Sequence, residues 1–353
     1  MKLGIVGLPN VGKSTVFNAL TKLDVPALNY PFCTIEPNQG MVLIPDERLH
    51  TIAKVSQPKT ITGATIEFVD IAGLVRGASK GEGLGNQFLG QIREMDALAH
   101  VVRLFRADDV LSQEEGINPL RDIEVIDLEL MLADLEAIER RRERTTRMLK
   151  TGKPHYREEL DLLDHYQAAL EGGTPLRRTD LPTMADLPLL SAKPVMYVAN
   201  INEGDQELEP AFLEWAQGEG AEVVVMAADF EMEISRLDSD DAELFLAEAK
   251  MDKPALHRLV AAGVRLLDLI TFYTIKGDET RSWIISRGML APQAAGQVHS
   301  DMERGFIRAE VINWQILVNE GSVASCREKG LARIEGKDYV VQDGDVIFFR
   351  FNV

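Results

Sequence analysis

Gly7-Leu8-Pro9-Asn10-Val11-Gly12-Lys13-Ser14-Thr15 is the stretch of sequence that decides the fold. It matches the pattern G-x-x-x-x-G-K-[ST], in which glycines let successive backbone N–H groups turn inward around phosphates. The apolar run Leu3 to Val6 before it predicts a strand, and Gly12 to Leu20 predicts a helix that the loop opens. This order of strand, loop and helix predicts a P-loop that binds a nucleoside triphosphate with Mg²⁺.

The loop residues have separate predicted roles. Lys13 is expected to reach the β- and γ-phosphates, and the hydroxyl of Ser14 is expected to bind Mg²⁺. The helix N-terminus adds partial positive charge. The predicted nucleotide-binding positions in this segment are Asn10, Val11, Gly12, Lys13, Ser14 and Thr15.

A second element of the site is predicted where the apolar run Ile66 to Val69 ends in Asp70. Asp70 is expected to support the metal, and the backbone N–H of Gly73 to sense the γ-phosphate. Thr34 lies in the connection where a switch threonine would complete the Mg²⁺ shell. The pattern D-x-x-G alone is a common turn. Its assignment to the metal site depends on its position one strand after the P-loop. Lys13, Gly73 and Thr34 are the predicted catalytic residues.

Further short, β-branched runs follow at His100 to Phe105, Val195 to Ala199 and Val223 to Met226. They are apolar throughout rather than alternating, which is typical of central parallel strands covered on both faces. Because they alternate with helical segments, they predict a doubly wound α/β sheet. Leu256 to Ile270 is predicted to be another amphipathic helix.

Two helical segments interrupt this alternation of strands and helices. Asp122 to Lys150 carries an apolar stripe at helical spacing, and Tyr156 to Leu170 is a second helical run before Gly172-Gly173. Together they predict an antiparallel helical hairpin inserted into the α/β domain. The charged run Glu139 to Arg144 has two readings, a grip on RNA or a partner and a solvated helix face. The interspersed glutamates favour the solvated face.

Past Thr274 the texture changes to β-like runs and turns. Asp343-Gly344 between Val341 and Val346 predicts a closing hairpin. The other strands are predicted at Ser282 to Ser286, Phe306 to Ile312, Tyr339 to Val341 and Val346 to Phe351. The predicted domains are therefore 1–120 with 191–274 for the nucleotide, 121–190 for the helical insertion, and 275–353 for a small α+β domain.

Composition limits the remaining function classes. The chain has 353 residues and a net charge of −18, which argues against a generally basic nucleic-acid binder. Residues 275–353 have a net charge of only −1, so an anionic partner fits best there. The chain has two cysteines, Cys33 and Cys326, which are far apart in the sequence, so we expect no disulfide framework. No run of apolar residues is long enough for a membrane helix, and we expect a cytoplasmic protein without a membrane partner.

The whole chain resembles the YchF/Obg-like ATPase family. The specific matches are the run Asp70 to Phe88 and the tail motifs Ala291 to Gly296 and Gly305 to Ala309. The resemblance implies a P-loop domain with a helical insertion and a C-terminal TGS domain, which is a β-grasp-like module. It also implies an ATPase that associates with ribosomes in stress or translation control, with the ribosome or rRNA contacted through the TGS and helical domains.

The resemblance also bears on the base that is bound. GTPases read guanine with N-K-x-D, whereas this chain has Asn200-Ile201-Asn202-Glu203. The lysine is replaced by Ile201 and the aspartate by the longer Glu203, so guanine selectivity should weaken. Family members prefer ATP, with adenine near Asn200 and Ile201, and Ala227 is expected at the other edge of the base. Losing a guanine contact does not by itself create adenine selectivity, so GTP stays open.

The group that orients the attacking water is unassigned. Leu74 stands where Ras-type enzymes have a glutamine, and Ser112 stands where bacterial relatives often carry a histidine. Hydrolysis must therefore use another group or a partner, or be slow. His100, which lies on a strand, is expected to be structural.

Three hypotheses remain at this point: a Mg²⁺-dependent ATPase that is weak alone, an Obg-type GTPase, and a nucleotide-gated binding module without useful turnover. In the C-terminal domain two readings also stay open, contacts to rRNA phosphates and ordinary exposed arginines. The residues concerned are Arg281, Arg287, Arg304 and Arg308. The oligomeric state is not predicted.

Overall fold

A computed structural model describes residues 1–22, 38–71, 84–106, 117–149, 153–205, 208–249 and 251–352. The described chain divides into two compact units, one containing residues 1–22, 38–40 and most of 67–263, the other residues 41–66 and 264–352. Each unit is built on its own six-stranded sheet.

The first sheet has the strand order β2-β4-β1-β5-β6-β7. Strands β1 and β4 pair in parallel, as do β1 with β5, β5 with β6, and β6 with β7. Strand β5 is buried along almost its whole length, which confirms the prediction from its unbroken apolar run. The bounds are β1 Lys2–Val6, β2 Gln39–Leu43, β4 Thr65–Asp70, β5 Ala97–Arg103, β6 Val195–Asn200 and β7 Val223–Met226.

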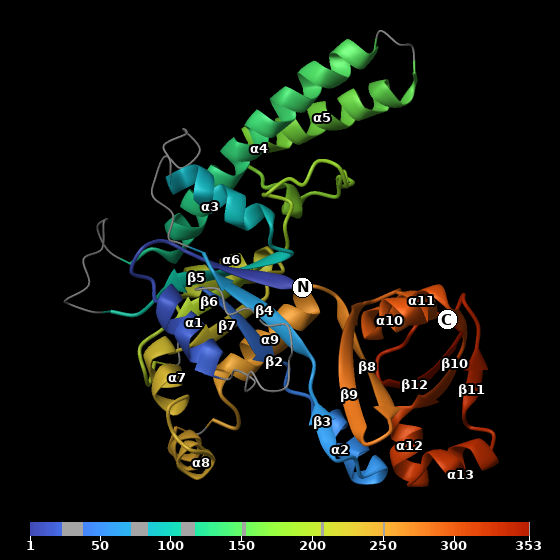
Figure 1. Ribbon diagram of the computed structural model, residues 1–353. Helices are drawn as coiled ribbons and strands as arrows, with labels where there is room; N and C mark the ends of the chain where they lie inside the picture. Colours follow the sequence, from blue (N-terminus) through green and yellow to red (C-terminus); the bar gives the residue numbers. More distant parts are fainter. Residues whose placement is uncertain are drawn as a thin grey trace. The chain divides into compact units, whose positions relative to one another are not determined.

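Helices flank this sheet (Figure 1). One core cluster joins Val6, Val69 and Leu98 of the strands to Phe88 of α3 and Ile126 of α4. The glycine at position 263 in α9 lets that helix approach the sheet, because a β-carbon there would lie 2.7 Å from the side chain of Leu3. The helices are α1 Lys13–Lys22, α3 Leu84–Arg93, α6 Pro210–Gly218, α7 Ala228–Ile234, α8 Ser239–Glu248 and α9 Ala255–Leu266.

The predicted helical insertion is present as α4, Pro119–Leu149, and α5, His155–Glu171, which pack along each other (Figure 1). Their shared core holds Met131 and Ile138 of α4 against Leu163 and Tyr166 of α5. A short 3₁₀ turn at Leu176–Arg178 follows and closes the end of this core with Leu176. No helix in the described ranges is both long and apolar enough to cross a membrane.

The second sheet has the order β11-β10-β12-β8-β9-β3. Its edge strand β3, Thr60–Thr62, pairs in parallel with β9, so residues 41–66 lie in the second unit although the sequence analysis places them in the nucleotide domain. The other elements are α2 Glu47–Ser56, β8 Leu269–Lys276, β9 Glu279–Ser286, α10 Ala291–Val298, α11 Ser300–Arg304, β10 Phe306–Asn313, α12 Trp314–Glu320, α13 Val323–Glu328, β11 Arg333–Glu335 and β12 Asp345–Phe351.

Two local predictions were wrong in this part of the chain. The helix expected to reach Ile270 ends at Leu266, because Asp268 adopts a left-handed conformation (φ 46°) and Ile270 belongs to β8. The expected closing hairpin does not form. Gly344 makes the predicted turn with φ 88°, but only Val340 of the preceding run makes a β-bridge, and β12 pairs with β10 and β8 instead.

Candidate nucleotide site

The loop between β1 and α1 holds two glycines at positions that leave no room for a β-carbon. A β-carbon at Gly7 would lie 2.5 Å from the carbonyl oxygen of Val101, and one at Gly12 would collide with the side-chain nitrogen of Asn200. Gly12 has φ 94°, and Asn10 also has positive φ (63°), a conformation that asparagine tolerates better than most residues. Positions 7 and 12 therefore require glycine, so that the loop can approach its neighbours closely.

Lys13 is held inside the loop that precedes it. Its side chain is buried, and its ammonium donates a hydrogen bond to the carbonyl oxygen of Leu8 (3.0 Å). Burial lowers the pKa of Lys13, and the nearby carboxylate of Asp70 partly opposes this. The cation is thus preorganised by backbone contacts beside Asp70, with its charge available to an anion.

Asp70, at the end of β4, meets Ser14 at the start of α1. The Ser14 hydroxyl donates to Oδ2 of Asp70 over 3.2 Å, while Oδ1 of Asp70 is buried with no hydrogen-bond partner in the described structure. Burial raises the pKa of Asp70, against the lowering effects of the Ser14 hydrogen bond and the charge of Lys13. A buried carboxylate oxygen of this kind, next to a serine hydroxyl, fits the oxygen ligands that Mg²⁺ prefers.

Asn200, at the end of β6, ties the loop to the opposite side of the site. Its Nδ2 donates to the carbonyl oxygen of Val11 (3.0 Å), and its Oδ1 accepts from the backbone N–H of Ala228 (3.0 Å). The residue is buried, and both ends of its amide are used within the protein. The sequence pointed to Asn200 as a base contact, but it did not reveal this bracing role.

The other residues predicted near the base lie at the ends of β6 and β7. The backbone N–H of Ile201 donates to the carbonyl of Met226 (3.0 Å), which fixes the two strand ends together. Glu203 is exposed, and Ala227 precedes the first turn of α7. Asn202, which the sequence analysis did not assign, holds the chain after β5 through hydrogen bonds to both backbone groups of Arg106.

Four positions discussed from the sequence cannot be placed. Thr34, Gly73, Leu74 and Ser112 lie outside the described residues. Their predicted roles therefore stay predictions.

Beside the site lies a buried polar cluster that sequence reasoning missed. Nη2 of Arg177 donates to both carboxylate oxygens of Asp127 on α4 (2.7 and 2.6 Å) and to the hydroxyl of Tyr197 (3.2 Å). The ring of Tyr197 lies 5.7 Å from that of His100. Burial, with the charges of Arg177 and Lys13, lowers the pKa of His100 to about 3, so this histidine is neutral in the fold. No sequence motif predicts these contacts, because Asp127 and Arg177 are 50 positions apart in the chain.

Three of the four C-terminal arginines considered for RNA contacts are engaged within their own unit. The guanidinium carbon of Arg281 lies 4.1 Å from the centre of the Trp283 ring. Arg287 forms an ion pair with Asp268 (2.8 Å), and Arg304 bonds to Asp301.

Two family models match parts of this chain, and curated relatives match its whole length. Residues 2–133 match a family described as "50S ribosome-binding GTPase", and residues 269–352 match YchF-GTPase_C, described as "Protein of unknown function (DUF933)". The chain is 48% identical to the "Ribosome-binding ATPase YchF" of Pasteurella multocida (strain Pm70), over 100% of this chain and 99% of that protein. It is 41% identical to "Obg-like ATPase 1" of Oryza sativa subsp. japonica, over 100% and 92%.

A solved structure shares the fold over nearly the whole length. The Schizosaccharomyces pombe YchF GTPase superposes with a TM-score of 0.89 at 34% identity, over 99% of this chain and 97% of that one. Together with the full-length identity to curated relatives, this similarity shows that the chain belongs to the YchF family.

Proposed function

We propose that this chain is a Mg²⁺-dependent ATPase, weak alone, whose nucleotide state controls its association with the ribosome. The observation that carries the proposal is the pairing of Ser14 with Asp70 beside the glycine loop, which leaves one buried carboxylate oxygen without a partner among the described residues. Relatives named ribosome-binding ATPases support the nucleotide and the partner.

In this proposal the loop amides of residues 10–15 and the ammonium of Lys13 bind the phosphates. Ser14 and Thr34 bind Mg²⁺, which supplies charge neutralisation at the phosphates, and Asp70 supports the metal. Gly73 senses the γ-phosphate through its backbone N–H. The buried Lys13 ammonium needs no reorganisation to meet an anion, because Leu8 already fixes its position.

Adenine is the proposed base. Ile201 in place of a lysine, and exposed Glu203 in place of an aspartate, remove the paired contact that GTPases make to guanine. Asn200, Ile201, Glu203 and Ala227 then line the base, with Asn200 acting mainly through its hold on the loop. Guanine is the alternative base, and the similarity to the Schizosaccharomyces pombe protein, which is named a GTPase, supports that alternative.

The domain assignments complete the proposal. The segments 1–120 and 191–263 hold the nucleotide, without residues 41–66, which belong to the second unit; 121–190 form the helical insertion, and 275–353 form a TGS domain. A cytoplasmic location and contact with rRNA follow from ribosome association. A nucleotide-gated binder without turnover is the remaining alternative.

Competition between ATP and GTP for one labelled nucleotide, with and without ribosomes, tests the proposal. ATP should displace the label at the lower concentration, and phosphate release should rise with ribosomes. A clear win for GTP would assign the chain to GTPases instead. Binding of ATP with no phosphate release in either condition would leave a binding module.

The site assignment has its own test. Lys13→Ala should weaken binding of either nucleotide, because it removes the buried cation. Lys22→Ala, at the exposed end of the same helix, is the matched control and should bind normally. Equal affinity in both variants would show that the nucleotide binds elsewhere.

A further inference from the structure

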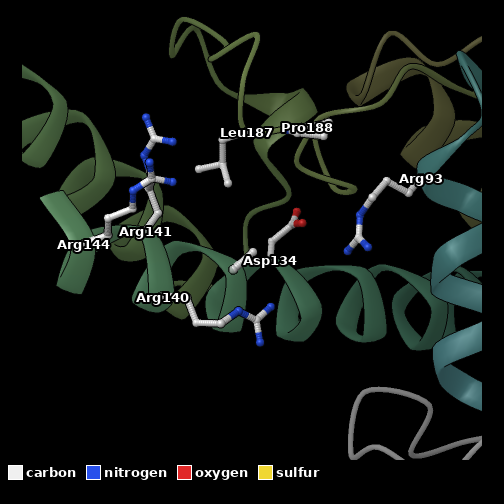
Figure 2. Close-up of a pocket in the computed structure, with 8 residues that line it drawn as sticks. Arg93, Asp134, Arg140, Arg141, Arg144, Leu187 and Pro188 are labelled. Atoms are coloured by element: carbon white, nitrogen blue, oxygen red, sulfur yellow. The ribbon is translucent and has the colours of Figure 1, made fainter.

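A cavity of about 430 Å³ lies between α3, α4 and the segment before β6 (Figure 2), and none of its lining residues belongs to the nucleotide loop. Its lining is strongly basic although the chain as a whole has a net charge of −18. Arg93 comes from the last turn of α3, and Leu187 and Pro188 form part of the wall. The remaining cations come from consecutive turns of α4: Arg140, Arg141 and Arg144.

Not all of this positive charge is neutralised inside the protein. In the described part of the chain, the guanidinium groups of Arg93 and Arg144 form no hydrogen bond or ion pair. Arg140 approaches Glu136 at 3.6 Å, but both side chains are more than half exposed, so that pair is weak. Arg141 is different, because Glu159 and Asp186 hold it at 2.6 and 2.7 Å.

The carboxylate in the cavity is already satisfied. Both oxygens of Asp134 accept backbone N–H groups, from Leu190 and Ser191, each at 2.7 Å. Burial raises the pKa of Asp134, and the charge of Arg93 is among the influences that lower it. Asp134 thus shapes the cavity wall through the backbone, while the cavity keeps an excess of guanidinium charge over carboxylate charge.

An adjoining cavity of about 530 Å³ shares Arg141 and Arg144 with the first. It adds two aromatic rings at the start of α5, His155 and Tyr156, whose centres are 4.0 Å apart. His155 is exposed and Tyr156 is half-buried. Its carboxylates, Glu159 and Asp186, are those that hold Arg141.

We infer that these two cavities form one binding site for a single RNA strand, with phosphates at the arginines and a base against Tyr156. Arg140 and Arg144 are four residues apart on a helix, so their side chains lie on one face and present two charges in succession. Guanidinium groups beside an aromatic ring form the combination that binds single strands, through phosphate contacts and base stacking. This inference rests on the proposed ribosome association and deepens it by naming the surface that meets RNA.

The two contributions have different signatures in a binding experiment. Phosphate contacts release counterions when the RNA binds. Each contact therefore steepens the slope of log K against log salt concentration by about 0.7 for a single strand. Stacking on an aromatic ring contributes affinity with little dependence on salt. Substitutions at the arginines and at the tyrosine should therefore separate the two.

The experiment measures fluorescence anisotropy of a labelled single-stranded RNA with the full chain across a series of salt concentrations. Arg140→Gln/Arg144→Gln should bind about tenfold more weakly. Its slope of log K against log salt concentration should be shallower by about 1.4, because two phosphate contacts are lost. Tyr156→Leu should bind more weakly with the slope unchanged. The control is Arg147→Gln/Arg157→Gln, which removes the same amount of charge from α4 and the neighbouring α5 at positions that line neither cavity.

Each other outcome would overturn the inference. An equal loss in the control pair would show general electrostatic attraction, and an unchanged affinity in the test pair would show that RNA binds elsewhere or not at all. Displacement of the RNA by inorganic phosphate at low concentration would assign the cavity to a small anion. ATP affinity, measured separately, should be normal in the arginine variants, so a failure here is distinguishable from a failure of the nucleotide site.

Discussion

The side-chain nitrogen of Asn200 lies too close to the position that a β-carbon at residue 12 would take for any residue other than glycine to fit there. The same nitrogen donates to the carbonyl oxygen of Val11. A single asparagine on β6 therefore fixes both the path of the loop and the identity of one of its residues. Substitutions on either side of this contact should affect nucleotide binding through the shape of the loop.

Gly12→Ala should abolish measurable nucleotide binding, because the added methyl collides with Asn200 and the backbone has positive φ. Gly220→Ala is the matched control. Gly220 also has positive φ, 60°, but a β-carbon there meets nothing within 4 Å. Isothermal titration with ATP should show loss of binding in the first variant and normal binding in the second. Normal binding by both would mean that the loop can rearrange around the methyl group.

Asp70→Asn should remove most of the gain in nucleotide affinity that Mg²⁺ provides, since the amide cannot supply the negative charge beside Ser14. Affinity measured with excess chelator should change little. Glu67→Gln, on the same strand, replaces a carboxylate that pairs with Lys2 instead and should keep the full Mg²⁺ effect. A normal Mg²⁺ effect in Asp70→Asn would exclude this carboxylate from the metal site.

Asp127→Ala should lower the free energy of unfolding by about 3–5 kcal/mol, because it leaves the buried guanidinium of Arg177 without its carboxylate partner. The double substitution Asp127→Leu/Arg177→Met should recover much of that loss, since it removes both charges of the pair. The exposed pair Glu143–Arg147 on the same helix is the control, and Glu143→Ala should change stability by less than about 0.5 kcal/mol. Chemical denaturation followed by circular dichroism measures all three, and a double variant no better than the single one would contradict the argument.

His100 should make the fold sensitive to acid. Its pKa is about 3 in the folded protein against an ordinary value of 6.5, so below pH 6.5 the unfolded chain takes up a proton that the folded chain excludes. This linkage should cost about 2 kcal/mol of stability at pH 5, and almost nothing at pH 7.5. His100→Leu removes the titrating group, so its thermal midpoint should fall less than that of the wild type between these two pH values. Parallel decreases in both proteins would assign the acid sensitivity to other groups.

Much of the first unit could be predicted from the sequence because its signals are local. The unbroken apolar runs of β1, β5 and β6, and the pattern from Gly7 to Thr15, depend on residues close in the chain. The two helices of the insertion were predicted for the same reason. Their apolar stripes report burial at helical spacing without reference to the rest of the fold.

The remainder depends on partners that no local pattern specifies. Asn200 reaches Val11 across 189 positions of sequence, and its bracing role appears only when the strands are assembled. Asp343-Gly344 predicted a turn correctly, but a turn signal does not say which strand pairs next, and β12 pairs with β10. In the same way, nothing in Thr60 to Thr62 shows that this short run will join β9.

Helix α4 belongs to two hydrophobic cores at once. Ile126 and Leu130 pack with the central sheet of the first unit, while Ile138 packs with α5. Its 31 residues make a rod roughly 46 Å long. If the helix tilted by about 5° at its sheet end, its other end would move by about 4 Å. A small change in the packing around Ile126 would therefore move the far end of α4 by several ångströms, enough to change its contacts with a bound macromolecule.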